Sequence, residues 1–581
     1  MDPDVVAGAT TIQRSQQPRT RHDPAIEPFA IAVAVASTAL VMLANLRGVD
    51  GVTLIAIGTA AATWLGTRKS LDIPRAAPWA AMALLAVIAV GRAPLGSHDM
   101  WAYVSYGRLV EHYHADPYHV VVARFPADPV FQLVGRVWWH TPSAYGPLLV
   151  GFAAVLSRLA GTSLVMLRLG FQVPAAVAMF ACVWIAARTT RRRAVVVLIG
   201  LQPMVWISVV NGAHADVYVA LGAVAAVALL RHDRVVGAAV VLGLAALVKI
   251  AALFAAPVMV AVLLGRKRVH DAARFTAGTG ALMVIAWLVA PSSFFSAARA
   301  THGIISRASP WRLVVSAHLT SSATASVLGL LAAAIIIAEV ARRCRDTSDL
   351  AAPIALALAS YAIVAGFTLP WYAVWSMPVA AMSRRRSIAV VTALHGAILL
   401  AAYQAGPASF SGRFSGGLLT IVLPIVTVAT LLVLVVSQPA PRMSRLRRVD
   451  VDASSGQLGA QLVQGGQRGF RSGAVGRRDR EHECFDDDER DAVAREESGC
   501  SATAAQHRVD ALGHPAARVG DQDDRHADRG RAVEKHSNVR LQSPVREHDD
   551  GIAGCDREEL VGERRTGVHQ RDARLPDPLA E

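Results

Sequence analysis

The sequence predicts an all-α, polytopic membrane protein of about 12–14 transmembrane helices, with a long first outer loop and a disordered C-terminal tail. Three observations lead to this prediction. Of the 581 residues 53% are hydrophobic and only 18% are charged, and the mean hydropathy of +0.38 is too high for a soluble protein of this length. The apolar runs consist mainly of Ala, Val and Leu, which suits close helix packing in lipid. Basic clusters occupy the short segments between these runs, as expected for cytoplasmic loops.

The N-terminal segment, residues 1–27, is polar and mixed in charge. It lacks the short apolar core and the small-residue cleavage site of a signal peptide. We therefore expect an uncleaved cytoplasmic N-terminus, followed by a membrane domain over residues 28–437.

Long apolar runs define this membrane domain, because a transmembrane helix needs roughly 17–25 predominantly apolar residues. About fourteen runs reach or approach that length. In chain order the candidate spans are residues 29–46, 52–65, 79–90, 169–187, 194–210, 217–230, 235–248, 251–264, 275–290, 323–340, 350–369, 372–382, 388–403 and 418–436.

The basic clusters test this order of spans. With a cytoplasmic N-terminus, all of them fall on the cytoplasmic side: residues 68–69, 188–193, 231–234, 266–268, 342–345, 384–386 and 442–448. This agreement requires residues 148–160, an apolar run that contains Arg158, to lie in the outer interface instead of spanning. It also requires residues 235–264 to form a hairpin of two spans, with Lys249 at its turn and facing outward. Residues 92–160 are then a long outer loop.

The C-terminal segment, residues 438–581, loses the apolar periodicity and contains two Phe and no Trp or Tyr. It cannot bury enough apolar surface to offset chain entropy, so we expect a disordered cytoplasmic tail. Fragments such as HECFDDDERD have irregular spacing, which does not favour a metal site. A frame-shifted gene end is an alternative origin of this composition.

Several function classes find no support in the sequence. The net charge of +14 resides largely in the short loops, which indicates a role in orientation and no nucleic-acid partner. The five cysteines show no CxxC or Cys/His spacing. There is no GxxxxGK[ST] loop, HExxH motif or convincing nucleotide-binding fold. We therefore expect neither a metal ion nor a cofactor.

The stretch GSHDMWAYVSYGRLVEHY, residues 96–113, contains the strongest candidate for chemistry, Asp99. This acid stands just past the end of a predicted span, where a carboxylate must be paired, solvated or used. His98 is adjacent, and Tyr103 and Tyr106 follow Asp99 at helical spacing. The alternative is that Asp99 only caps the helix that begins there.

Two Pro-bearing turns follow in the same loop. The first is DPY, with Asp116 and Tyr118, and the second is AYGPL, with Tyr145. Such turns hold a loop in one conformation. We count Asp116, Tyr118 and Tyr145 as candidate substrate contacts, together with His98, Tyr103 and Tyr106.

The order HDMWAYVSYGRLV, ADPY and WWHTPSAYGPLL resembles the first outer loop of the GT-C membrane glycosyltransferases. It is most similar to the glycosyltransferase 87 family and the actinobacterial polyprenol-phosphomannose-dependent mannosyltransferases. The resemblance covers roughly the first 440 residues and not the tail. Its strongest parts are the acid after the span, the YG pair, DPY and YGPL, whereas NGAHAD and PWYAVW are weaker.

The resemblance implies a GT-C-like fold and a sugar transfer on the extracytoplasmic face of the plasma membrane. The donor would be a polyprenyl-phosphate sugar, with mannose as the sugar, and the acceptor a cell-envelope glycan or glycolipid. Asp99 would be the catalytic base, because a sugar hydroxyl needs a carboxylate within hydrogen-bond reach. The reaction would be a single displacement with inversion and with phosphate as leaving group, and the relatives generally work without a metal.

Cations near the outer face would stabilise the charge that develops on such a phosphate. The candidates are Lys249, Arg307 and Arg312. For the two arginines, snorkelling to the interface is the alternative. Lys249 is harder to explain in that way, because long apolar runs flank it on both sides.

Two further motifs carry candidate substrate contacts. NGAHADVY contains His214 and Asp216, and the alternative is a polar turn whose Asp caps the next helix. PWYAVW contains Trp371 and Tyr372, which could stack on a sugar ring, and the alternative is interfacial anchoring. We expect one outward-facing cavity to be bordered by Asp99, Tyr103, Lys249, Trp371 and Tyr372.

Two other classes remain open at this point. A transporter or lipid flippase would also have many spans and a few intramembrane charges. Against it, no internal repeat links the two halves, and the polar residues concentrate in the predicted outer loops. A membrane scaffold without activity is the third possibility.

Overall fold

The computed structural model describes residues 25–68, 70–306, 308–404, 425–426 and 429. All of these residues fall within one compact unit, Met1–Val449 with Leu575–Glu581, and none within the second unit, Asp450–Arg574. The predicted span 418–436 falls mostly outside the described residues. So do the basic cluster 442–448, the tail 438–581 and most of the N-terminal segment.

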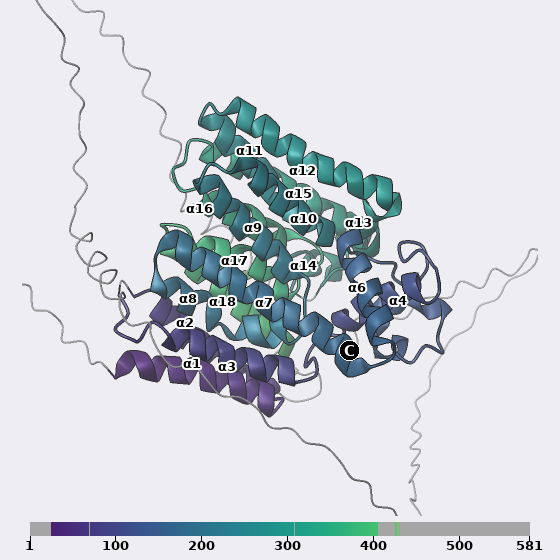
Figure 1. The fold of residues 1–581 in the computed structure, drawn as a ribbon, viewed down its shortest axis with the longest axis horizontal. Helices are drawn as coiled ribbons and strands as arrows, with labels where there is room; N and C mark the ends of the chain where they lie inside the picture. The colour runs from purple at the N-terminus through teal and green to yellow at the C-terminus, as the bar shows by residue number, and fades with distance from the viewer. Residues whose placement is uncertain (1–24, 69, 307, 405–424, 427–428, 430–581) are drawn as a thin grey trace, which may run out of the picture. The chain divides into compact units, whose positions relative to one another are not determined.

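The described part of the chain is helical and contains no strand, so the all-α prediction is confirmed (Figure 1). The α-helices are α1 (Ile26–Leu43), α2 (Gly48–Gly66), α3 (Ala77–Gly91), α4 (Asp99–Glu111), α5 (Arg136–Trp139), α6 (Pro147–Ala160), α7 (Leu164–Thr190), α8 (Arg193–Gly200), α9 (Asp216–Arg231), α10 (Val235–Val248), α11 (Ala256–Gly265), α12 (Val269–Val289), α13 (Ser296–Thr301), α14 (Trp311–Ser316), α15 (Ser322–Cys344), α16 (Ala351–Val364), α17 (Ala373–Ala381) and α18 (Arg386–Gln404).

Six helices of the described residues are long and apolar enough to cross a membrane by themselves: α1, α2, α7, α12, α15 and α18. Shorter apolar helices accompany them, including α3, α10 and α16. Many side chains on the long helices stay exposed although they are apolar, such as Val177 on α7 and Leu288 on α12. Lipid is the solvent that tolerates such surfaces, so the chain is a polytopic membrane protein.

Two predicted spans are broken in the structure. Residues 194–210, expected as one helix, form α8 and then a separate π-helix, Val205–Val210. The interruption falls at Leu201 and Gln202, directly before Pro203, which has no N–H to continue the hydrogen-bond ladder. Residues 251–264 likewise begin as a 3-10 helix, Ile250–Ala255, before α11 starts.

The predicted hairpin around Lys249 is present. Helix α10 ends at Val248, and the chain turns through the 3-10 helix into α11. Arg268, just beyond α11, pairs with Asp233, just before α10, so the two open ends of the hairpin meet. Lys249 therefore lies at the opposite end, as the sequence predicts.

The basic clusters meet at one end of the helices, here called the basic end. Their arginines donate hydrogen bonds to carbonyl groups of neighbouring loops: Arg192 to Ser383, Arg231 to Met382, Arg266 to Thr347 and Arg386 to Thr67. Helix α9 carries Arg231 at this end and Asp216 at the other, about 24 Å away for its 16 residues. We call the end that carries Asp216 and Lys249 the cavity end.

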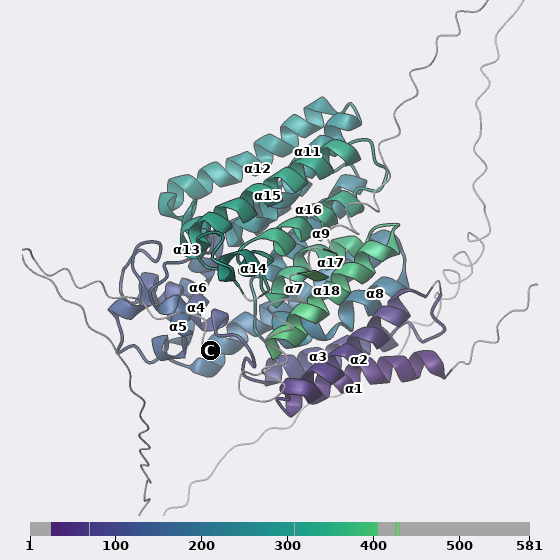
Figure 2. The same ribbon diagram turned by 180° about the vertical axis from the view of Figure 1, so that it is seen from behind.

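The predicted outer loop, residues 92–160, folds as a small helical layer with its own apolar cluster (Figure 2). Helices α4 and α6 pack closely, because Gly107 lies directly against the backbone of Ala153, where a Cβ would collide. A buried ion pair holds the layer together: Arg108 donates two hydrogen bonds to Asp128, 2.8 and 3.0 Å long, and Tyr113 donates a third. This layer presents the first residue of α4 to the helices at the cavity end.

Candidate active site

Asp99 is the first residue of α4 and is 6% exposed. The N-cap position belongs to His98, and the Asp99 carboxylate does not cap the helix. Its Oδ1 accepts a hydrogen bond of 2.8 Å from the indole Nε1 of Trp138. The alternative that Asp99 is only a helix cap is therefore wrong.

Burial changes the acidity of this group. Desolvation raises the pKa of Asp99 from 3.8 to about 6, although the Trp138 hydrogen bond and the positive charge of Lys249 act in the opposite direction. The charge of Asp216 adds a smaller upward shift. A carboxylate with a pKa near 6 is mostly ionised at neutral pH and still takes up a proton more readily than an ordinary aspartate.

The motif NGAHAD reaches the site from the other side, and its first residue fixes the backbone that leads to Asp99. The Asn211 side-chain amide donates to the carbonyls of Ala89, Arg92 and Ala93, at 3.0–3.2 Å. Its Oδ1 accepts the N–H of Leu95 at 2.8 Å. Asn211 thus ties the C-terminal end of α3, and the segment after it, to the π-helix.

His214 lies behind Asp99 and is fully buried. Its ring stacks on Trp371, with centroids 3.6 Å apart and planes 15° apart. Its Nδ1 lies 3.6 Å from Oδ2 of Asp99 and 3.4 Å from the hydroxyl of Tyr103. Burial, together with the charge of Lys249, holds the pKa of His214 well below its usual value, so the imidazole is neutral.

Asp216 and Lys249 form a buried ion pair of 2.9 Å at the cavity end. Trp375 donates a hydrogen bond of 2.6 Å to the same carboxylate oxygen. The Asp216 carboxylate therefore binds two side chains and does not cap α9, which corrects the capping alternative here too. The Lys249 ammonium also lies over aromatic rings, 4.4 Å from the centroid of Tyr372 and 5.6 Å from that of Tyr145.

One cavity of about 180 Å³ opens between these groups. Asp99 and Lys249 both line it, so an acid and an amine face the same space. Seven aromatic side chains line the wall: Trp138, Tyr145, Phe254, Tyr361, Phe367, Tyr372 and Trp375. Small residues of α13 and of the segment after α16 contribute to it, including Ala297 and Ala365. Such a lining, apolar and aromatic with a few converging polar groups, is typical of small-molecule sites.

The expectation of a single shared cavity is partly met. Asp99, Lys249 and Tyr372 line the cavity, whereas Tyr103 and Trp371 do not. Tyr103 packs edge-on against Tyr145, 4.6 Å between centroids, and Trp371 packs on His214. These two rings support the lining from behind.

Burial also decides the role of the PWYAVW aromatics. Trp371 and Tyr372 are 9% and 6% exposed, and Trp375 is fully buried. Interfacial anchoring, the alternative considered for these rings, requires contact with lipid headgroups and is therefore wrong.

The remaining predicted site residues lie elsewhere. Tyr106 donates a hydrogen bond to the Thr141 carbonyl, and His98, which is exposed, contacts the Leu133 carbonyl. None of the following lines the cavity: His98, Tyr106, Asp116, Tyr118, His214, Asp216 and Arg312. Arg307 lies outside the described residues.

Asp116 is a turn residue. Its Oδ1 accepts the N–H of Tyr118 at 2.8 Å, and its Oδ2 pairs with the exposed His119 at 2.7 Å. The DPY motif therefore fixes the loop, as expected, without bringing its acid to the cavity.

The structure adds two residues that the sequence analysis did not single out. Trp138 orients Asp99, and Asn211 fixes the segment before it. Trp138 belongs to the WWHTP part of the motif and Asn211 is the first residue of NGAHAD, so both lie within motifs that carry the resemblance.

Both glycines of the tyrosine–glycine pairs lie at close backbone contacts. Gly107 abuts Ala153, and a Cβ at Gly146 would collide with the Leu247 backbone. The Gly146 N–H also donates to the Val248 carbonyl, at 3.0 Å. Because Lys249 follows directly, the YGPL turn sets the position of the ammonium group.

Within the described residues, no three His, Cys, Asp or Glu side chains come together in a way that could hold a metal ion. The expectation of a metal-free reaction stays a prediction.

The chain was compared with known protein families. The family described as alpha-(1->6)-mannopyranosyltransferase, N-terminal domain, matches residues 9–265. That range includes Asp99, Trp138, His214, Asp216 and Lys249. No curated protein matches the chain significantly.

Proposed function

We propose that the chain is a membrane mannosyltransferase, in line with the family that matches residues 9–265, and that it transfers mannose from a polyprenyl-phosphate donor. The acceptor in this proposal is a hydroxyl of a cell-envelope glycan or glycolipid. The cavity end faces the extracytoplasmic side of the plasma membrane, and the reaction needs no metal. The observation that carries the proposal is that the Asp99 carboxylate and the Lys249 ammonium line the same small cavity.

Asp99 acts as the general base. Its carboxylate lines the cavity, and the Trp138 hydrogen bond holds one oxygen while the other stays close to His214. The pKa of about 6 suits a base that works near neutral pH. His214, buried and neutral, lies behind Asp99 as a positioning residue and does not compete for the proton.

Lys249 acts on the leaving group. Its ammonium has three donors, and the contact with Asp216 at 2.9 Å occupies one of them. The cavity lining gives the ammonium a wall of rings in place of water, so its charge is weakly screened there. A phosphate oxygen that gains charge as the glycosidic bond breaks is the group such a cation stabilises best.

The charges around the cavity call for more than one cation. Asp99 and Asp216 together exceed the single charge of Lys249. Arg312 and Arg307 remain the candidates to complete the phosphate site. Ser306 and Ser309, in the segment before Arg312, donate hydrogen bonds to the carbonyls of Gly366 and Ala365, which line the cavity, whereas Arg312 itself does not line it.

The proposed reaction is one displacement. An acceptor hydroxyl oxygen attacks the anomeric carbon of mannose while its proton passes to Asp99. The bond between that carbon and the phosphate oxygen breaks, and its electron pair leaves with the polyprenyl phosphate. Attack from the side opposite to the leaving group inverts the anomeric configuration.

The test uses the full-length protein in membranes with radiolabelled polyprenyl-phosphate mannose and with labelled nucleotide-linked mannose. We expect transfer from the lipid-linked donor by the wild type, and loss of transfer in Asp99→Asn. Asp116→Asn, an exposed acid of the same loop, is the matched control and should retain activity. Transfer from the nucleotide-linked sugar alone would contradict the donor class, and equal activity in Asp99→Asn would remove Asp99 from the mechanism.

A further inference from the structure

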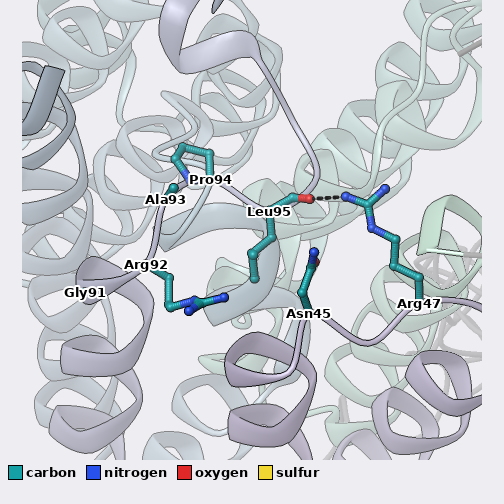
Figure 3. Close-up of a pocket in the computed structure, with 7 residues that line it drawn as sticks. All are labelled: Asn45, Arg47, Gly91, Arg92, Ala93, Pro94 and Leu95. Atoms are coloured by element: carbon teal, nitrogen blue, oxygen red, sulfur yellow. Dashed lines mark hydrogen bonds between the residues drawn. The ribbon is translucent and has the colours of Figure 1, made fainter. Parts of the chain in front are cut away.

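A second cavity, of about 440 Å³, lies beside the α1–α2 turn at the end of α3. Its lining consists of Asn45 and Arg47 from the turn and residues 91–95 from α3 and the segment after it (Figure 3). That segment continues into Ser97 and Asp99, so this cavity belongs to the cavity end of the helices. It shares no lining residue with the cavity that Asp99 lines.

Two guanidinium groups give this second cavity a positive charge. Arg47 and Arg92 both extend their side chains into the space between the turn and α3 (Figure 3). The lining contains no carboxylate, and neither arginine forms an ion pair with any residue in the described ranges. Arg47 donates one hydrogen bond of 2.7 Å to the Leu95 carbonyl, which leaves most of its donors unused.

The helix ends nearby do not account for both charges. The C-terminal ends of α1 and α3 each contribute about half a negative charge, and the N-terminal end of α2 contributes about half a positive one. Arg47 is the N-cap of α2 and gives it no side-chain cap, so the first N–H groups of α2 stay open as well. Asp50, in the first turn of α2, adds one negative charge, and Arg168, which donates to the Arg92 carbonyl, adds one positive charge. The sum therefore remains positive.

The floor of the cavity is held rigidly. The Leu95 N–H donates to Asn211, and the Arg92 carbonyl accepts hydrogen bonds from Arg168, at 2.6 Å, and Gln172, at 3.1 Å. A preformed site loses little conformational entropy when a ligand binds.

Apolar side chains are exposed on α1 just before the α1–α2 turn. Leu40 and Leu43, in the last turn of α1, are 50% and 52% exposed. A headgroup in the cavity would therefore leave its acyl chains beside exposed leucines of a membrane-spanning helix.

We propose that this cavity binds a phosphate anion, supplied by the headgroup of an anionic phospholipid. Guanidinium groups match phosphate oxygens in geometry, are weakly hydrated and bind phosphate more strongly than neutral donors do. Free inorganic phosphate has the same chemistry and is the other source. The proposal does not depend on the role of Asp99, and its test measures binding alone.

The experiment uses lipid-stripped, full-length protein in uncharged detergent micelles. Fluorescent phosphatidylglycerol is titrated into the wild type, into the double variant Arg47→Gln/Arg92→Gln, and into the control Arg136→Gln/Arg158→Gln. The control removes two exposed arginines of the predicted outer loop. Phosphatidylcholine and inorganic phosphate are titrated in parallel arms, and the melting temperature of each protein is recorded.

We expect the double variant to bind phosphatidylglycerol about tenfold or more weakly than the wild type and the control. Phosphatidylcholine should bind weakly to all three proteins. If inorganic phosphate alone shows the same loss, the site takes free phosphate. Equal binding of phosphatidylglycerol and of phosphate by all three proteins would overturn the proposal, and the two arginines would then serve only the ends of α1 and α3.

Discussion

The neutral ring of His214 lies flat on Trp371 and points its Nδ1 at the Asp99 carboxylate, 3.6 Å away. Both residues are buried, and they come from segments more than 100 positions apart. The carboxylate therefore lies between His214 on one side and Trp138 on the other, and it also lines the cavity. The first predictions concern this enclosure.

Asp99→Asn should lower the rate of sugar transfer by about 10²- to 10⁴-fold, the usual contribution of a general base. The amide oxygen can still accept the Trp138 hydrogen bond, so the fold should persist. Initial rates with saturating donor measure the effect. A loss of less than threefold, with normal expression, would contradict a catalytic role.

The activity should depend on pH through Asp99. Only the ionised carboxylate accepts a proton, so kcat/KM should fall about tenfold per pH unit below the pKa of about 6. A rate profile between pH 4.5 and 8 tests this expectation. An acid limb centred near pH 4 would mean that Asp99 is solvated and not enclosed.

The raised pKa of Asp99 also makes the free energy of unfolding depend on pH. The native state binds this proton more tightly than the unfolded state does, so the free energy of unfolding should fall as pH rises from about 4 to about 6 and stay lower above that. The difference between 3.8 and about 6 corresponds to about 3 kcal/mol at neutral pH. Asp99→Asn removes this term, so its melting temperature at pH 7.5 should exceed that of the wild type. Thermal unfolding in detergent at pH 5 and pH 7.5 measures both, and a variant that melts lower at pH 7.5 would contradict the argument.

His214→Phe should shift the acid limb of the pH profile upward. The phenyl ring can keep the stack on Trp371 while it removes the polar Nδ1 beside Asp99, and a less polar surrounding raises a carboxylate pKa. A merely structural role for His214 would lower the amount of folded protein without moving the limb. The pH profile and the melting temperature, taken together, separate the two.

The ion pair between Lys249 and Asp216 should behave as a unit. Lys249→Met leaves a fully buried carboxylate unpaired, and Asp216→Asn leaves the ammonium unpaired. Each should destabilise the protein by about 3–5 kcal/mol, whereas the double variant should recover much of that loss. Transfer activity should not recover in the double variant, because the cation that faces the phosphate is gone. Additive losses of stability would show that the two groups do not interact.

Gly146→Ala should impair the site without touching its chemistry. A Cβ there would collide with the Leu247 backbone and displace the end of α10, and Lys249 with it. We expect a loss of both melting temperature and activity. Gly151→Ala, on the open side of α6, is the matched control and should stabilise slightly, since alanine favours helix. Equal effects at the two glycines would contradict the close contact.

The helices were largely predictable, because apolar runs and basic clusters repeat along the chain. The predicted span 235–248 has the same bounds as α10, and the turn at Lys249 lies where the basic clusters require it. The prediction of a single span over residues 194–210 is wrong, because the structure has two separate helices there. Hydropathy does not detect the break in the helix that Pro203 introduces. Hydropathy measures burial, whereas a helix also needs an unbroken ladder of N–H donors.

The site was predictable in its charges and not in its contacts. Asp99 and Lys249 stood out because ionisable groups are rare beside apolar runs. Trp138 did not, since its bond to Asp99 joins residues 39 positions apart through an irregular loop, and no periodicity reports such a pairing. Capping was a fair alternative for Asp99 and Asp216 on local grounds, and only their long-range partners exclude it.

The arginines of the basic end bind carbonyl groups of neighbouring loops, and this restricts how the orientation of the protein in the membrane can be measured. A reporter domain or epitope inserted between α9 and α10, or between α17 and α18, would separate guanidinium groups from the carbonyls that hold them, and could itself reorient the chain. Single cysteines at exposed positions such as His140 avoid that disturbance. The two cysteines of the described residues, Cys182 and Cys344, are buried, so a membrane-impermeant maleimide should leave them unlabelled. With Cys484, Cys500 and Cys555 replaced by serine, the label then reports on the introduced thiol.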